Sequence, residues 1–117
     1  MDLRDLVLAV LRIDMLTARQ WIADARRAGF RWAESCRPVD LDARELAVAA
    51  ALVGLMAERE KVSTPEWVAS VPPAIKDVWL VPSALKMPRL RRDIEANCPA
   101  PLRRKHVYAT ENFLTIA

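Results

Sequence analysis

Hydrophobic residues in the first third of the chain recur at the spacing of an amphipathic helix. Between residues 3 and 11 the apolar side chains follow an i, i+3, i+4, i+7 rhythm, and Asp2 stands where a carboxylate can cap the first turn. Residues 17–20 (TARQ) have the form of a capping box, which predicts the start of a second helix, and Gly29 suits its end. The pattern therefore predicts a helical hairpin over residues 1–29.

The longest uncharged stretch runs from Leu46 to Ala57, and it predicts a buried helix. Residues 42–45 (DARE) form another capping box immediately before it, and residues 58–61 (EREK) mark the return to water. A helix that is apolar on nearly every face is buried in a soluble protein. We therefore expect a central helix over residues 43–61. Its twelve uncharged residues are fewer than the roughly 20 that a membrane span needs.

All eight prolines lie between residues 38 and 101, so shorter elements are expected there. The hydroxyl of Thr64 is predicted to cap a helix that has Pro65 in its first position and ends before Pro72. Another helix is predicted over residues 88–97, and a last helical turn after Thr110. Short extended segments are expected near residues 78–81 and 106–109. The prediction is a mainly α, single compact domain over residues 1–117, with five to six helices around the central one.

Composition agrees with one soluble domain and narrows the function classes. The chain has 117 residues, of which 53% are hydrophobic and 28% are charged, so neither a disordered tail nor a fibrous repeat is indicated. The first five residues do not have the basic head of a secretory signal. We therefore expect a cytoplasmic protein that does not enter a membrane. Cys36 and Cys98 stand far apart without metal-ligand spacing, and free thiols are expected.

No catalytic motif stands out. The two glycines are isolated, so neither phosphate-binding nor dinucleotide-binding glycine loops are present, and the single histidine excludes a two-histidine zinc helix. The arginine–histidine spacing typical of a helical class of ribonucleases is also absent. No cofactor or metal site is predicted, and an enzyme is the weaker hypothesis. Its most concrete form uses His106 with Arg103, Arg104 and Tyr108 on a phosphodiester.

The charge distribution is more informative. Residues 1–81 contain eleven basic and twelve acidic residues, a net charge of −1, whereas residues 82–117 contain seven basic and three acidic residues, a net charge of +4. The basic residues form two foci, residues 89–92 and residues 103–106. Arginine pairs with carboxylates or phosphates through its planar fork. An ordinary solvated helix face with local salt bridges would also explain them. The basic residues, with the adjacent histidine, are Arg89, Arg91, Arg92, Arg103, Arg104, Lys105 and His106.

Tryptophan adds a second candidate for partner contact. Trp67 and Trp79 lie in proline-punctuated segments, and tryptophan and arginine are favoured at the energetic centres of interfaces. Core packing of a small domain is the alternative. The two residues and the basic foci together make up the candidate binding residues.

Residues 43–117 resemble small bacterial antitoxin-like proteins and the C-terminal parts of actinobacterial helix-turn-helix regulators. The resemblance rests on the alanine-rich helix ending at residues 57–59 (AER) and on the segments 65–67 (PEW), 79–82 (WLVP), 99–105 (PAPLRRK) and 113–114 (FL). It implies a protein that acts by binding a toxin or an operator. In such regulators a DNA-reading helix-turn-helix precedes this region, but residues 1–37 lack its sharp glycine-containing turn.

The sequence therefore leads to two main hypotheses. The first is a non-catalytic protein-binding module, the antitoxin or regulatory component of a bacterial two-gene system, whose partner is the product of an adjacent gene. The second is a nucleic-acid-binding regulator that uses the basic C-terminal region, residues 82–117. Self-association stays open.

Overall fold

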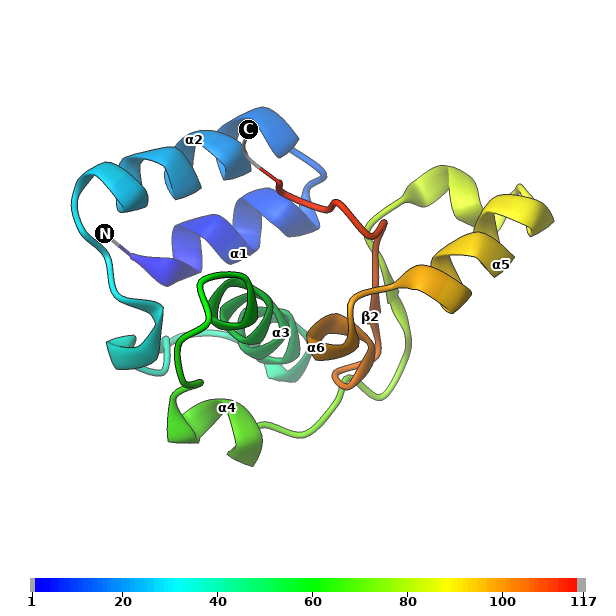
Figure 1. The fold of residues 1–117 in the computed structure, drawn as a ribbon. Coiled ribbons are helices and arrows are strands. Elements are labelled where there is room, and N and C mark those ends of the chain that lie inside the picture. Colours follow the sequence, from blue (N-terminus) through cyan, green and yellow to red (C-terminus); the bar gives the residue numbers. More distant parts are fainter. Residues whose placement is uncertain (1, 116–117) are drawn as a thin grey trace.

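The N-terminal hairpin forms as the hydrophobic rhythm predicts. In the computed structural model, which describes residues 2–115, α1 (Leu3–Leu11) and α2 (Met15–Arg27) pack against each other (Figure 1). The carboxylate of Asp2 accepts a hydrogen bond from the backbone of Arg4, which confirms the predicted cap of α1. Gly29 ends the hairpin with a φ of 73°, in the left-handed region that favours glycine.

The predicted start of α2 at Thr17 is wrong. Asp14 is the N-cap, and its carboxylate accepts hydrogen bonds from the backbone N–H and the hydroxyl of Thr17. Gln20 does not reach back to the cap, because its amide donates to Asp24 instead. An ionised carboxylate at the first turn favours this start, since it both caps the helix and complements its dipole.

The central helix is α3 (Ala43–Arg59), and its capping box is confirmed. Asp42 and Glu45 each accept a hydrogen bond from the other's backbone N–H, at 2.8 and 2.9 Å. Every residue from Leu46 to Ala57 is buried, and α1, α4 (Glu66–Ser70), α6 (Ala100–Arg103) and the 3₁₀-helix η1 (Trp32–Glu34) pack against α3 (Figure 1). The helix ends two residues before the predicted boundary.

A glycine allows α6 to approach α3 closely. A Cβ atom built on Gly54 would lie 3.3 Å from the Cβ of Pro101, closer than ordinary van der Waals contact. This glycine in the middle of a helix is therefore explained by packing rather than by backbone conformation.

α4 starts one residue later than predicted, with Pro65 as its N-cap, and no side chain caps it, so the predicted capping by Thr64 is wrong. Its end before Pro72 is confirmed.

The extended segment near residue 78 pairs with a second strand, a partner that the sequence did not identify. β1 (Val78–Trp79) pairs in parallel with β2 (Val107–Tyr108), with Val78 opposite Val107.

The C-terminal region contains α5 (Pro88–Asn97), as predicted, together with two short helices that the sequence did not predict, η2 (Pro82–Leu85) and α6. On α5, Ile94 is buried and Leu90 half-buried. After Thr110 the chain forms turns instead of the expected helix, and Phe113 and Leu114 are buried. The mainly helical fold around a buried central helix is confirmed.

The hydrophobic core joins both halves of the chain. Residues of α1, α3 and both strands belong to one cluster of buried side chains, and Leu114 and Ile22 of α2 both belong to it and line the same cavity. Trp21, Phe30 and Trp32 form an aromatic group with ring centroids 4.9–5.9 Å apart. Among residues 2–115, no helix is both long enough and apolar enough to span a membrane.

Candidate partner-binding surface

The sequence-predicted candidates lie around the β1–β2 pair and on α5, except Trp67, which lies on α4. Backbone hydrogen bonds from Val78 to His106 and from Leu80 to Tyr108, at 2.8 and 2.9 Å, hold the two strands together. A further bond runs from the N–H of Ala74 to the carbonyl of Lys105, at 3.1 Å. These bonds fix the second basic focus, residues 103–106, against the segment that follows α4.

Lys105 is engaged within the fold. Its ammonium group donates hydrogen bonds to the carbonyl oxygens of Val68, at 2.7 Å, and of Val71. These carbonyls lie at the C-terminal end of α4, where a cation is favoured by the helix dipole. Burial lowers the pKa of Lys105, whereas the two carbonyl oxygens favour the ammonium form that donates to both. The side chain therefore joins α4 to the turn before β2.

His106 is also part of this connection. Its Nδ1 lies 2.8 Å from the carbonyl oxygen of Ala74. A carbonyl can only accept, so Nδ1 carries the hydrogen. The backbone of His106 has a φ of 60°, in the left-handed region, and its carbonyl accepts the bond from Val78. The side chain and the backbone of His106 thus both position the segment that leads into β1.

The aromatic pair of the small sheet carries an arginine. Trp79 and Tyr108 are half-buried and stacked, with ring centroids 4.7 Å apart and planes inclined by 18°. The guanidinium carbon of Arg91 lies 5.2 Å from the centroid of the Trp79 ring, and its Nε donates to Glu95 at 3.2 Å. Partial burial and the carboxylate of Asp77 raise the pKa of Tyr108.

Trp67 contacts the protein's own backbone. Its indole Nε1 donates to the carbonyl oxygen of Ser35 at 2.9 Å, which ties α4 to the connection before α3. Trp67 and Trp79 thus both have intramolecular partners and are both half-buried. Neither indole presents its whole surface to a partner.

Arg103 and Arg104 lie at the end of α6 and in the turn that follows. The charge of Arg103 acts on Tyr108 and opposes the rise in the pKa of that phenol. Arg104 lines a cavity of about 460 Å³ between α3, α4 and α6, together with Glu58 and Glu66. Arg104 thus shares this cavity with two carboxylates of the same chain, but it forms no ion pair with either of them.

The first basic focus is different. Arg89 and Arg92 are exposed on α5, and within residues 2–115 neither makes an ion pair or a side-chain hydrogen bond. Lys86 is exposed just before the helix. No acidic residue occurs between residues 82 and 92, which contain four cations. This segment therefore has the least compensated charge in the C-terminal region.

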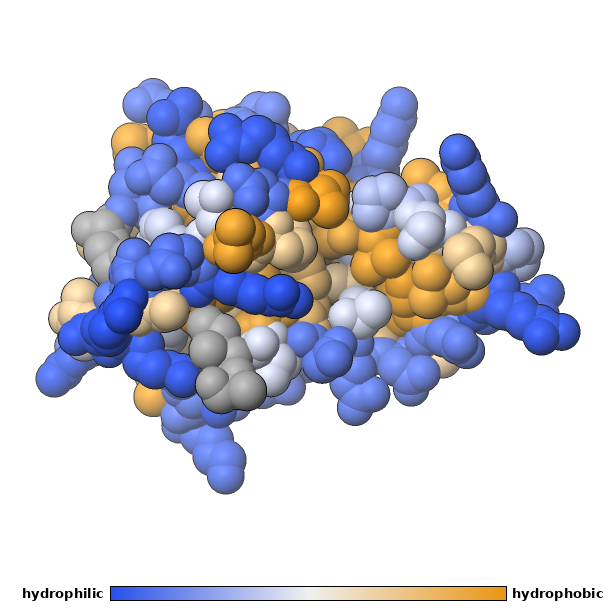
Figure 2. Space-filling view, turned by 90° about the horizontal axis from the view of Figure 1, so that it is seen from above, coloured by the Kyte–Doolittle hydropathy of each residue, from blue (hydrophilic) through white to orange (hydrophobic). Residues whose placement is uncertain are grey.

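Two exposed apolar residues are next to these cations in the sequence, and sequence reasoning missed their exposure. Leu85 is 60% exposed and Met87 is 53% exposed. Figure 2 shows hydrophobic side chains at the end of the molecule that carries η2 and α5, with hydrophilic side chains around them. The only signal in the sequence is that both apolar residues fall outside the helical rhythm of α5. We name this set the η2–α5 surface: Leu85, Lys86, Met87, Arg89 and Arg92.

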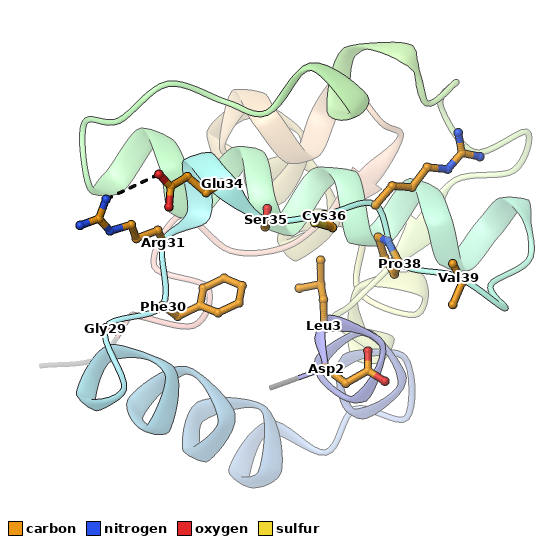
Figure 3. A pocket seen from close by; sticks show the side chains of 11 residues that line it. Asp2, Leu3, Gly29, Phe30, Arg31, Glu34, Ser35, Cys36, Pro38 and Val39 are labelled. Carbon is orange, nitrogen blue, oxygen red and sulfur yellow. Dashed lines mark ion pairs between the residues drawn. The ribbon is translucent and has the colours of Figure 1, made fainter.

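Another hollow is lined by residues of the N-terminal third of the chain. It has a volume of about 570 Å³ and lies between the start of α1 and the connection after α2 (Figure 3). Leu3, Phe30 and Val39 line it, and Arg31 and Glu34 form an ion pair at 3.5 Å beside it. The exposed thiol of Cys36 also lines it. No histidine or buried carboxylate accompanies these groups.

Both cysteines are free thiols, as the sequence predicts. Cys98 is buried, and its Sγ lies 3.5 Å from the carbonyl oxygen of Val107, while burial raises the pKa of the thiol. Within residues 2–115 no group of three or more metal-ligating side chains comes together.

In comparisons with protein-family models, with curated proteins and with solved structures, nothing matched this chain. The resemblance of residues 43–117 to antitoxin-like proteins therefore gains no support from them.

Proposed function

We propose that this chain is a non-catalytic protein-binding module that contacts an acidic partner through the η2–α5 surface. One observation carries the proposal: residues 82–92 hold four cations and no acid, and they expose Leu85 and Met87 beside them. Arginine and methionine are enriched at protein interfaces, whereas charged residues that only keep a protein soluble are usually mixed in sign.

The order of charges along α5 supports a role beyond stability. Its first turn contains no acidic residue and its last turn no basic one. Arg89 and Arg91 thus lie near the positive end of the helix dipole, where cations are unfavourable. Natural proteins break such local rules mainly at functional sites. A partner with carboxylates would neutralise the charge that α5 concentrates there.

The resemblance to antitoxin-like proteins supports a partner encoded beside this chain, as in a bacterial two-gene system. In that arrangement the present chain is the antitoxin or regulatory component, and its partner supplies the acidic surface. The interface then resembles other transient contacts, in which complementary charge sets the rate of association and the choice of partner.

Co-purification with the product of the adjacent gene tests the proposal. We expect the untagged neighbour to be retained by the tagged chain, and the double variant Arg89→Glu/Arg92→Glu to weaken retention by about tenfold or more. The matched control is Arg19→Glu/Arg26→Glu, which makes the same change of charge at two exposed positions of α2. Equal retention by the two double variants, or no retention by the parent chain, contradicts the proposal.

Nucleic-acid binding is the second candidate, because four cations without an acid would also suit phosphates. The aromatic pair does not favour it: the Trp79 ring is already packed against Tyr108 and Arg91, so it is not an open platform for a base. Retardation of DNA or RNA that declines steeply with salt, and that Arg89→Glu/Arg92→Glu abolishes, would establish this candidate instead.

A further inference from the structure

We infer that the partner of the η2–α5 surface is an acidic amphipathic segment, with apolar side chains that cover Leu85 and Met87 and carboxylates that reach Arg89 and Arg92. This inference rests on the proposed function and specifies the chemistry of the partner.

The exposed side chains of the η2–α5 surface favour a partner segment that is both apolar and acidic. Leu85 and Met87 each expose more than half of their area, and Lys86 stands between them in the chain. A purely acidic segment would leave the apolar side chains in water, and its contacts with exposed cations would be weak and screened by salt. A purely apolar segment would cover Lys86 without a counter-charge. Alternating apolar and acidic side chains satisfy both groups.

Arg89 and Arg92 are available because neither forms an ion pair with a carboxylate of α5. Glu95 pairs with Arg91. Asp93, four residues after Arg89 in α5, lines a cavity with Arg59 and Asn97. Within residues 2–115 no carboxylate pairs with Arg89 or Arg92. The occupant therefore has to supply the carboxylates.

Two other occupants fit the surface less well. A second copy of this chain, related by a two-fold axis through the surface, would place the same cations opposite each other, and the whole chain carries a net charge of +3. Addition of a strand to the small sheet is also disfavoured, because β1 and β2 have only two residues each and offer few backbone partners. Recognition here depends on side chains.

The test uses the full chain and a fluorescein-labelled peptide of about 16 residues, with leucines at helical spacing and glutamates between them. Fluorescence anisotropy is expected to show saturable binding that weakens as sodium chloride rises from about 50 to about 300 mM. Two control peptides separate the contributions: one has glutamine in place of every glutamate, and the other has alanine in place of every leucine. Each should bind at least about tenfold more weakly.

Variants of the protein then locate the binding. We expect Arg89→Glu/Arg92→Glu and Leu85→Ser each to weaken binding of the peptide. The matched controls are Arg19→Glu/Arg26→Glu and Leu16→Ser, the latter at a leucine that is 81% exposed on α2, and both should bind as the parent chain does. Unfolding does not confound Arg89→Glu, because an acid in the first turn of α5 is favoured by the helix dipole. Circular dichroism checks the fold of each variant.

The outcomes separate this inference from the proposed function. Equal binding of either control peptide, or equal loss in the matched control variants, overturns the inference. If the adjacent-gene product is retained through Arg89 and Arg92 but the peptide does not bind, the proposed function stands and the amphipathic segment is wrong. If a single-stranded oligonucleotide of similar charge binds through the same arginines more tightly than the peptide, the surface recognises phosphates and the inference is also overturned.

Discussion

Lys105 shows how a residue can look like a surface cation in the sequence and yet hold the fold together. It stands in the run of residues 103–106 (RRKH), but its ammonium group is bonded to two carbonyls at the end of α4, more than 30 positions earlier in the chain. Charge-assisted hydrogen bonds of this kind are stronger than those between neutral groups. Lys105 and Arg104 therefore differ in role although they are neighbours.

We expect Lys105→Met to lower the free energy of unfolding by about 1–3 kcal/mol, because the change keeps the aliphatic stem but removes both hydrogen bonds. Lys86→Met is the matched control at an exposed lysine and should change the free energy by less than about 0.5 kcal/mol. Urea titration followed by circular dichroism measures both. Equal stability of the two variants would show that the bonds to α4 do not stabilise the fold.

Asp14 gives a second prediction at the scale of one residue. Hydrogen bonds from the side chain and backbone of Thr17 lower the pKa of the Asp14 carboxyl below the usual value of 3.8. A folded-state pKa below the unfolded value means that the stabilisation is present above pH 3.8 and is lost as the pH falls through the folded pKa.

The variant Asp14→Asn isolates this effect, since an amide oxygen also caps a helix but does not titrate in this range. We expect the parent chain to be more stable than Asp14→Asn near neutral pH, and the difference to shrink below about pH 4. Thermal unfolding at a series of pH values measures the difference. A gap that stays constant down to about pH 2 would mean that Asp14 does not cap α2 as an ionised group.

At the scale of the element, α5 is the helix whose ends are least adapted to stability. Its N-cap is Met87, which cannot accept a hydrogen bond from the first turn, and cations follow directly. α3, in contrast, has a complete capping box and a basic residue in its last turn. This difference agrees with the proposed role of α5 in contacting a partner and with the role of α3 at the centre of the core.

We expect Met87→Asp to raise the free energy of unfolding by about 1 kcal/mol, because aspartate supplies the missing cap and complements the dipole. Met87→Ser, which caps without charge, should stabilise by a smaller amount. Under the proposed function both variants weaken partner binding, since each removes an exposed apolar contact, and Met87→Asp also reduces the local positive charge. Destabilisation by both variants would contradict the assigned start of α5.

Elements whose signals are local could be predicted from the sequence. α1, α3 and α5 were predicted close to their observed limits, because hydrophobic rhythm, caps and prolines all act within a few residues of the helix. The predicted start of α2 was wrong because two local signals competed. Residues 17–20 fit a capping box, but Asp14, three positions earlier, offers a stronger cap. Short helices such as η2 and α6 contain too few residues for a periodic signal.

Interactions between distant segments could not be predicted. The pairing of β1 with β2, the bond from Trp67 to Ser35 and the position of Lys105 under α4 all join residues about 30 positions apart. The candidate surface was therefore only partly foreseen. Charge counting located Arg89 and Arg92, but the exposure of Leu85 and Met87 depends on how η2 packs against α5, which no local pattern determines.

At the scale of the whole molecule, the end of the described chain returns to the N-terminal hairpin. Residues 109–115 run back toward α2 (Figure 1), Phe113 and Leu114 are buried, and Arg59 of α3 donates to the carbonyl of Glu111 at 3.4 Å. The C-terminal region is thus attached to the rest of the domain independently of the β1–β2 pair. This arrangement predicts that both halves of the chain unfold together.

Phe113→Ala tests that cooperativity. Because the ring is buried, the variant should lose about 3–5 kcal/mol of unfolding free energy, and unfolding should remain one transition. Tryptophan fluorescence, to which Trp21 and Trp32 of the aromatic group contribute together with Trp67 and Trp79, should change at the same urea concentration as the helical circular dichroism signal. Leu16→Ala at an exposed position of α2 is the control and should leave the midpoint nearly unchanged. If the tryptophan fluorescence persisted after most of the helical signal was lost, the N-terminal hairpin would be an independent folding unit. The burial of Phe113 and Leu114 would then not couple the unfolding of the two halves of the chain.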